Sequence, residues 1–152
     1  MKKFIVLSIV LLMLAGFAIT SSAEVVTLFA DQDVDVGTLT VERIGDNLIV
    51  TYAITAPWVL GETHLYVGDS APTKSAPGRF PYGPDDVAEE GKYVIDLEDF
   101  TGTLVIAAHA EVTNPDEIDI ITGLPREETA WAYGTQIRTG KNWAMYFEFV
   151  VE

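Results

Sequence analysis

From residue 24 onward, apolar side chains recur at every second position in one segment of the chain after another. The clearest segments are 47–55, 62–67, 93–97, 103–112 and 143–151. A period of two indicates β-strands that bury one face and leave the other in water. A short apolar run at 25–30 adds a first strand, and the one weak helical signal covers 127–133. The sequence therefore predicts an antiparallel all-β domain.

The segment 34–43 contains a change of phase at Gly37. Its apolar positions are first even-numbered and then odd-numbered, namely Val34, Val36, Leu39 and Val41. A one-residue bulge at Gly37 would bring all four side chains to the same face. We therefore expect one bulged strand here, followed by a hairpin turn at 45–47.

The number of strands predicts two packed layers. Seven to eight strands within residues 24–152 favour a single β-sandwich domain of the jelly-roll or immunoglobulin-like type, because a single sheet would leave one apolar face in water. Two connections, 68–91 and 113–142, are long for a compact domain and contain aromatic residues. We expect both to be loops that fold back onto the sandwich.

The N-terminus has the three parts of a secretory signal peptide. Lys2 and Lys3 precede an apolar run at 4–19, and 21–23 supplies small residues for cleavage. The apolar run is shorter than the roughly 20 residues of a membrane-spanning helix. We expect residues 1–23 to be removed, no membrane span in what remains, and a secreted protein, extracellular or periplasmic.

Composition excludes several classes of function. The 152 residues include 9 Lys and Arg against 23 Asp and Glu, a formal net charge of −14, and no cysteine. Such acidity disfavours nucleic acid as a partner, and the lack of cysteine excludes disulfide scaffolds, zinc ribbons and cysteine nucleophiles. No Gly-x-Ser-x-Gly or phosphate-binding loop motif occurs either. We therefore expect the protein not to be an enzyme.

The only two histidines lie in strand segments with matching carboxylates. His64 follows Glu62 by two residues, and His109 precedes Glu111 by two. If these strands pair antiparallel with residue numbers that sum to 173, the four side chains form one patch. Directly opposed residues have Cβ atoms about 4.5–5.5 Å apart, which suits zinc or copper. Alternatively, the histidines form a pH-sensitive contact or bond to nearby carboxylates or a loop.

Calcium is the other candidate metal. Asp31, Asp33 and Asp35, with Glu42 eleven residues after the first, loosely imitate a helix-loop-helix calcium loop. The position that needs glycine holds Val36, and the flanks are strands, so that motif is disfavoured. Two alternatives remain. These aspartates form a looser calcium site on the surface, or they make a polar strand end that opposes edge-to-edge aggregation.

Aromatic residues at strand ends and in the long segments suggest a sugar-binding platform. We select Tyr82, Trp131 and Tyr133 as candidate ligand-binding residues, on condition that their rings are exposed. Trp143 is in phase with Met145 and is expected in the core. The alternative is that all these rings close the ends of the sandwich.

Ordered blocks of sequence resemble a known group of modules. The blocks are WVLGETHLYVG at 58–68, PGRFPY at 77–82, IAAHA at 106–110, ETAWA at 128–132 and GKNWAMYF at 140–147. They are similar to those of a family of secreted or surface-displayed prokaryotic β-sandwich modules without an established activity. The resemblance covers the chain after residue 23 and implies a surface-associated module, with no role for any single residue.

Three hypotheses of function follow. The leading one is a secreted, non-catalytic binding module whose partner is a glycan or a cell-surface protein. The second is a metal-binding domain that uses the His/Glu patch, and the third is a purely structural surface or matrix protein. Exposed aromatic rings would favour the first, a close histidine pair the second, and buried rings with separated histidines the third.

Overall fold

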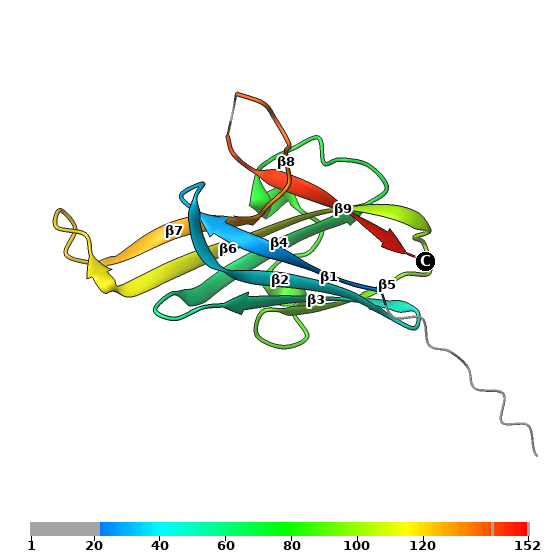
Figure 1. The fold of residues 1–152 in the computed structure, drawn as a ribbon, viewed down its shortest axis with the longest axis horizontal. Coiled ribbons are helices and arrows are strands. Elements are labelled where there is room, and N and C mark those ends of the chain that lie inside the picture. Colours follow the sequence, from blue (N-terminus) through cyan, green and yellow to red (C-terminus); the bar gives the residue numbers. More distant parts are fainter. Residues whose placement is uncertain (1–21, 141, 152) are drawn as a thin grey trace, which may run out of the picture.

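The computed structural model describes residues 22–140 and 142–151, so nearly all of the expected signal peptide lies outside the described residues (Figure 1). The strands are β1 (Ala23–Ala30), β2 (Val34–Ile44), β3 (Asn47–Ile54), β4 (Val59–Gly68), β5 (Lys92–Asp96), β6 (Gly102–Ile118), β7 (Pro125–Ala132), β8 (Thr135–Gln136) and β9 (Met145–Val151). Two 3-10 turns, η1 (Pro77–Arg79) and η2 (Pro84–Asp86), interrupt the connection between β4 and β5. None of the described residues forms a helix long and apolar enough to cross a membrane.

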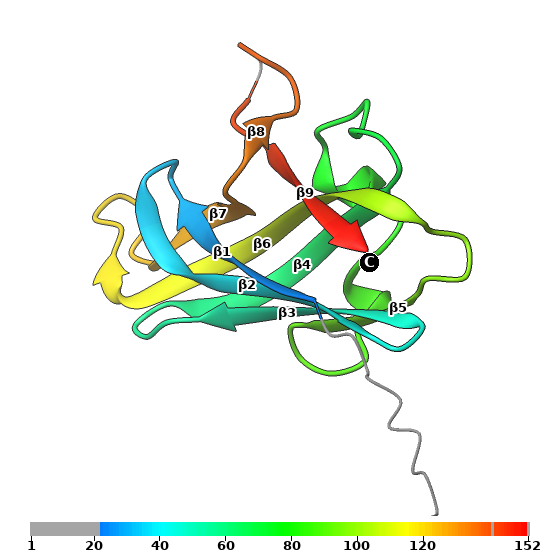
Figure 2. The same ribbon diagram turned by 45° about the vertical axis from the view of Figure 1, so that its right-hand side comes forward.

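The strands form an open antiparallel sheet that folds over on itself. Its order is β5-β3-β2-β1-β7-β6-β9-β8, and β4 pairs with β6 outside this path. The long strand β6 pairs with β4 on one side, and on the other with β9 along its first part and with β7 along its second. Figures 1 and 2 show β6 as a long strand that runs along the molecule behind β1.

One apolar core joins the two layers. Leu39 of β2 and Val50 of β3 are fully buried with Leu65 of β4 and Ile106 of β6 in a single cluster. The sheet passes from one layer to the other where β1 pairs with β7 over three residues, Leu28–Ala30. The prediction of an all-β sandwich is therefore confirmed.

The predicted bulge at Gly37 is also confirmed. The β1–β2 register shifts so that Leu28 faces Gly37 while Phe29 faces Asp35. Gly37 has φ +145°, and an added Cβ would lie 2.1 Å from the carbonyl oxygen of Ala53. Glycine is therefore required, because any side chain would collide with the backbone of the neighbouring strand.

The segment 113–142 is not the single long loop expected from the sequence. Strand β6 continues to Ile118 and β7 returns from Pro125, so the first half of the segment is a β-hairpin. The weak helical signal at 127–133 was also wrong, because nearly all of those residues lie in β7. The far end of this hairpin projects beyond the sandwich (Figure 1). Polar residues therefore occur on both of its faces, and the alternation that marks a half-buried strand is lost.

A second, smaller apolar cluster lies on the outer face of β6 and β7. Ala107, Trp131 and Ala144 form its centre, and Phe80 and Trp143 pack against it. Trp143 was predicted to lie in the main core, but it precedes β9 and packs against this outer cluster. The predicted loop 68–91 does fold back, and its Tyr82 exchanges backbone hydrogen bonds of 2.9 and 3.2 Å with Leu65.

Candidate functional site

The two histidines face each other across neighbouring strands. His64 of β4 pairs with His109 of β6, and the sum of 173 holds from Thr63 to Gly68. The ring centroids lie 5.7 Å apart. His109 is only 3% exposed, and its ring centroid lies 5.0 Å from that of Trp131. The strand pairing on which the histidine patch depends is therefore present for the two histidines.

The two carboxylates do not complete the predicted four-residue patch. A bulge between Leu60 and Thr63 changes the register. It is Gly61 that lies against Glu111, since a Cβ added to Gly61 would be 3.1 Å from the Glu111 carbonyl oxygen. No group of three or more His, Asp or Glu side chains able to hold a metal ion occurs within residues 22–140 and 142–151. The prediction that Glu62, Glu111 and both histidines form one metal site is therefore wrong.

The histidine pair is poorly solvated and carries unpaired nitrogens. Burial, reinforced by the nearby His64, lowers the pKa of His109 to about 4, so His109 is neutral at pH 7. The Nδ1 atoms of His64 and His109 are both buried, and neither has a hydrogen-bond partner among the described residues. Buried polar atoms nearly always have a partner in native proteins, so this pair calls for an explanation.

The proposed aromatic platform does not form. Trp131 is 4% exposed, and its ring meets that of Phe80 edge-on at 6.0 Å. Tyr82 is partly buried against the main core. Only Tyr133 is largely exposed, at 60%. Sequence reasoning missed this burial because the loop that covers the outer face of β6 and β7 cannot be deduced from strand alternation.

The aspartates of the β1–β2 turn have other roles. Oδ1 of Asp35 accepts a hydrogen bond of 3.0 Å from the backbone N–H of Gly37. Asp31 forms an ion pair of 3.4 Å with Arg126. Glu42 lies in β2, well into the strand. The calcium site remains a prediction without support in this geometry.

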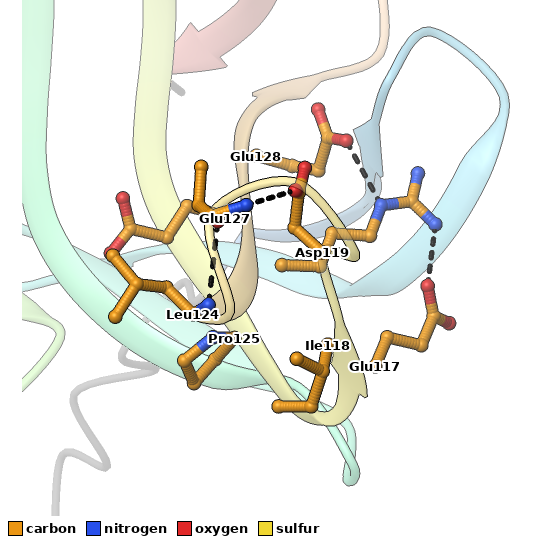
Figure 3. A pocket seen from close by; sticks show the side chains of 9 residues that line it. Glu117, Ile118, Asp119, Leu124, Pro125, Glu127 and Glu128 are labelled. Carbon is orange, nitrogen blue, oxygen red and sulfur yellow. Dashed lines mark hydrogen bonds and ion pairs between the residues drawn. The ribbon is translucent and has the colours of Figure 1, made fainter.

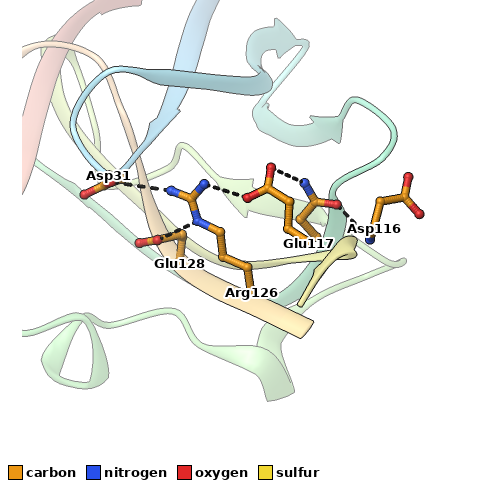
Figure 4. A network of polar contacts seen from close by, with 6 residues as sticks. Asp31, Asp116, Glu117, Arg126 and Glu128 are labelled. Carbon is orange, nitrogen blue, oxygen red and sulfur yellow. Dashed lines mark hydrogen bonds and ion pairs between the residues drawn. The ribbon is translucent and has the colours of Figure 1, made fainter. Parts of the chain in front are cut away.

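Arg126, which was not selected from the sequence, is the centre of a charged network next to the turn of the hairpin (Figure 4). Its guanidinium donates to Glu117 at 2.8 Å, to Glu128 at 3.0 Å and to Asp31 at 3.4 Å. Glu117 and Glu128 raise the pKa of Arg126 above its ordinary value. The guanidinium carbon also lies 5.6 Å from the centre of the Trp58 ring. The network fastens the hairpin to the β1–β2 turn and to the end of the sandwich.

A hollow of about 410 Å³ opens beside this network (Figure 3). Its walls combine the carboxylates of Glu117, Asp119 and Glu127 with the apolar side chains of Ile118 and Leu124. It therefore offers negative charge and aliphatic surface side by side, next to the end of the hairpin.

The end of the hairpin, residues 118–124, is the most apolar exposed part of the described chain; we call it the hairpin tip. Ile120 is 98% and Ile121 90% exposed, and Ile118 and Leu124 are more than half exposed. The signal was visible in the sequence, since two adjacent isoleucines directly precede the turn residues Thr122 and Gly123. It was missed because these residues were assigned to a loop that folds back.

The tip is also conformationally fixed. Oδ1 of Asp119 accepts hydrogen bonds from the N–H groups of Ile121 at 2.7 Å and Thr122 at 2.9 Å. The Asp119 carbonyl accepts from Gly123 at 2.8 Å, and the Asp119 N–H donates to Leu124 at 2.9 Å. The hydrogen bonds from the backbone N–H groups of Thr122 and Ile121 to the Asp119 carboxylate lower the pKa of Asp119. The turn thus satisfies most of its own amides.

Comparison with known proteins found no matching family model, no matching curated protein and no matching solved structure. The resemblance to secreted prokaryotic modules therefore stays a prediction, and the case for function depends on the geometry above.

Proposed function

We propose that the protein is a non-catalytic interaction module that docks a protein partner through the hairpin tip. The observation that carries this proposal is the group of four exposed aliphatic side chains at the end of a projecting hairpin. Soluble monomers usually expose large apolar residues singly, and a contiguous group marks an interaction site. Export from the cytoplasm, suggested by residues 1–23, is part of the proposal.

The order of the tip supports binding with little loss of freedom. Because Asp119 already holds the amides of the turn, burying Ile120 and Ile121 against a partner leaves few backbone groups to be satisfied. A segment that is ordered before binding also costs less conformational entropy on association. Rigid side chains that enter a pocket are the usual anchors of an interface.

Charge defines the partner further. Glu117, Glu127 and Glu128 lie beside the tip and Asp119 is part of it, and the chain as a whole has a net charge of −14. A partner with an apolar pocket and a rim of Lys and Arg complements this surface and is attracted over a long range. An anionic lipid surface is disfavoured by the same charges.

A glycan partner is less well supported. Of the three rings selected from the sequence, Trp131 is buried and Tyr82 is packed against the core. Tyr133 alone offers a free face, and its ring is held edge-on by Phe29 at 5.8 Å. An aliphatic tip suits a protein pocket better than the face of a sugar.

The test compares the double substitution I120S/I121S with a matched control, V94S/V150S, which alters two exposed valines on strands β5 and β9. Each variant and the wild-type chain 24–152 is immobilised, and surface proteins of the producing cells are passed over it. Any retained protein is purified, and its dissociation constant is measured. We expect I120S/I121S to weaken binding by at least about tenfold and the control to leave it unchanged.

Two outcomes would contradict the proposal. Equal affinity of I120S/I121S and the wild type would exclude the tip as the docking site. Retention of surface glycans by the wild type, with no protein bound, would exclude the class of partner.

A further inference from the structure

The histidine pair offers a second site that is independent of the hairpin tip. His64 and His109 occupy directly opposed positions on β4 and β6. Each has a buried Nδ1 atom without a hydrogen-bond partner among the described residues, and His109 is nine-tenths buried or more. Two desolvated nitrogens on facing rings are suited to a ligand that both can bind at once.

The separation of the rings fits a bridging ion. Bonds between an imidazole nitrogen and a metal are about 2.0–2.1 Å long, so an ion that joins two such nitrogens holds them about 4 Å apart. The ring centres must then lie somewhat farther apart than the nitrogens. The observed distance between the centroids is 5.7 Å, which is short enough for both rings to reach the same ion.

We propose that His64 and His109 bind a single monovalent soft cation of the Cu(I) type through their Nδ1 atoms. An imidazole nitrogen binds a metal ion in its neutral form, and no third His, Asp or Glu joins the two histidines within the described residues. Zinc requires four ligands, whereas Cu(I) and its analogue Ag(I) accept two. Burial with only neutral ligands also disfavours a double positive charge.

Trp131 and the covering loop pack against the two rings. The Trp131 ring lies 5.0 Å from that of His109, centre to centre, and contributes to the burial of this histidine. Gly83 of the covering loop lies against the other ring, since a Cβ added there would be 3.8 Å from Cδ2 of His64. The loop thereby covers the Cδ2 edge of the His64 ring.

The composition of the chain makes the test selective. There is no cysteine, and His64 and His109 are the only histidines. Met145 is the one methionine beyond residue 13, so residues 24–152 contain a single competing soft ligand. Ag(I) is the suitable probe because it does not change oxidation state in air.

The experiment titrates silver nitrate into the chain 24–152 in chloride-free buffer and follows the heat of binding. We expect one Ag(I) per chain and a rise in the melting temperature. His64→Gln, at the half-buried position, should weaken binding by more than about tenfold. A loss of about tenfold is what is expected when a residue only supports a metal ligand and does not bind the metal itself. Met145→Leu and the double substitution E62Q/E111Q should leave affinity unchanged. His109→Gln is interpreted only if its circular dichroism matches the wild type.

A second readout identifies the atoms that bind. In nitrogen NMR spectra, Ag(I) should shift the Nδ1 resonances of both histidines together and leave Nε2 protonated. No binding by the wild type would overturn the proposal. Unchanged affinity of His64→Gln, equal loss in E62Q/E111Q, or a shift at Nε2 alone would overturn it as well.

Discussion

The outer cluster and the hairpin tip lie on the same two strands, β6 and β7, and they treat their apolar side chains in opposite ways. In the outer cluster a covering loop buries Trp131 and Ala107. At the tip nothing among the described residues covers Ile120 or Ile121. The aromatic region is therefore part of what holds the fold together, and the aliphatic tip is surface that the fold does not need.

The largest effect that would test this difference is expected at Trp131. Replacing it with alanine should lower the free energy of unfolding by about 3–5 kcal/mol, because a large buried side chain is lost and a cavity remains. Tyr133→Ala, two residues further along, is the matched control and should cost less than about 1 kcal/mol, since its ring is 60% exposed. Urea unfolding measures both.

If Trp131→Ala lowers the free energy of unfolding by less than about 1 kcal/mol, the packing of the covering loop on this ring contributes little to stability. The ring would then be available to a ligand, and the sugar-binding platform would return as an alternative.

A second test addresses the main core through its buried tyrosines. Burial raises the pKa of Tyr52 and of Tyr93. The hydroxyl group of Tyr93 forms a 2.7 Å hydrogen bond with the hydroxyl of Thr63 and donates to the Thr63 carbonyl at 2.9 Å. In the unfolded chain a tyrosine ionises near pH 10. The stability contributed by the neutral hydroxyls is therefore fully present below pH 10 and is lost as the pH rises towards the folded values.

We expect Tyr93→Phe to cost roughly 1–2 kcal/mol at pH 7, because the Thr63 hydroxyl loses its buried partner. The cost should shrink as the pH rises above 10, where the wild type is itself destabilised. Tyr133→Phe, at an exposed ring, is the control and should follow the wild-type curve. A penalty for Tyr93→Phe that is constant from pH 7 to 11 would contradict this account. Guanidinium unfolding at several pH values supplies the measurement.

The residues whose position could be predicted share one property. The face of the sheet on which each one lies is set by the alternation of apolar and polar residues in its own strand. Gly37 was identified because the phase of the valines and leucines around it changes by one. The alternation in two strands placed each histidine on the face opposite the apolar side chains, and the pairing of His64 with His109 was one of the strand arrangements that it allowed. The position of Glu62 did not follow, because the bulge at Gly61 breaks the register at that point.

The rest depends on contacts between distant parts of the chain. Burial of Trp131 requires Phe80 of a loop fifty residues earlier to lie against it. The hairpin at 113–132 was missed because its strands project beyond the core, where no buried face imposes a period of two. Its charged anchor at Arg126 also joins residues far apart, since Asp31 belongs to the β1–β2 turn.

The smallest expected effect concerns this anchor, which lies on β7 between the hairpin tip and Trp131 of the outer cluster. Arg126→Met keeps an aliphatic chain over Trp58 but removes the charge shared by Glu117, Glu128 and Asp31. Partly exposed ion pairs contribute little singly, so we expect a loss of about 1 kcal/mol at low salt. Because salt screens such pairs, the difference from the wild type should narrow in 1 M sodium chloride.

Lys92→Met is the matched control for the anchor, since Lys92 makes one exposed pair with Glu89 at 3.7 Å, and it should change stability by less than about 0.5 kcal/mol. Amide hydrogen exchange locates the loss: in Arg126→Met the amides of 126–129 should exchange faster, while those of the outer cluster at Ala107 should keep their protection. Equal acceleration in both places would mean that the hairpin and the outer cluster open as one unit. The tip would then be a stable part of the sandwich, and the contrast between the two regions would be one of exposure alone.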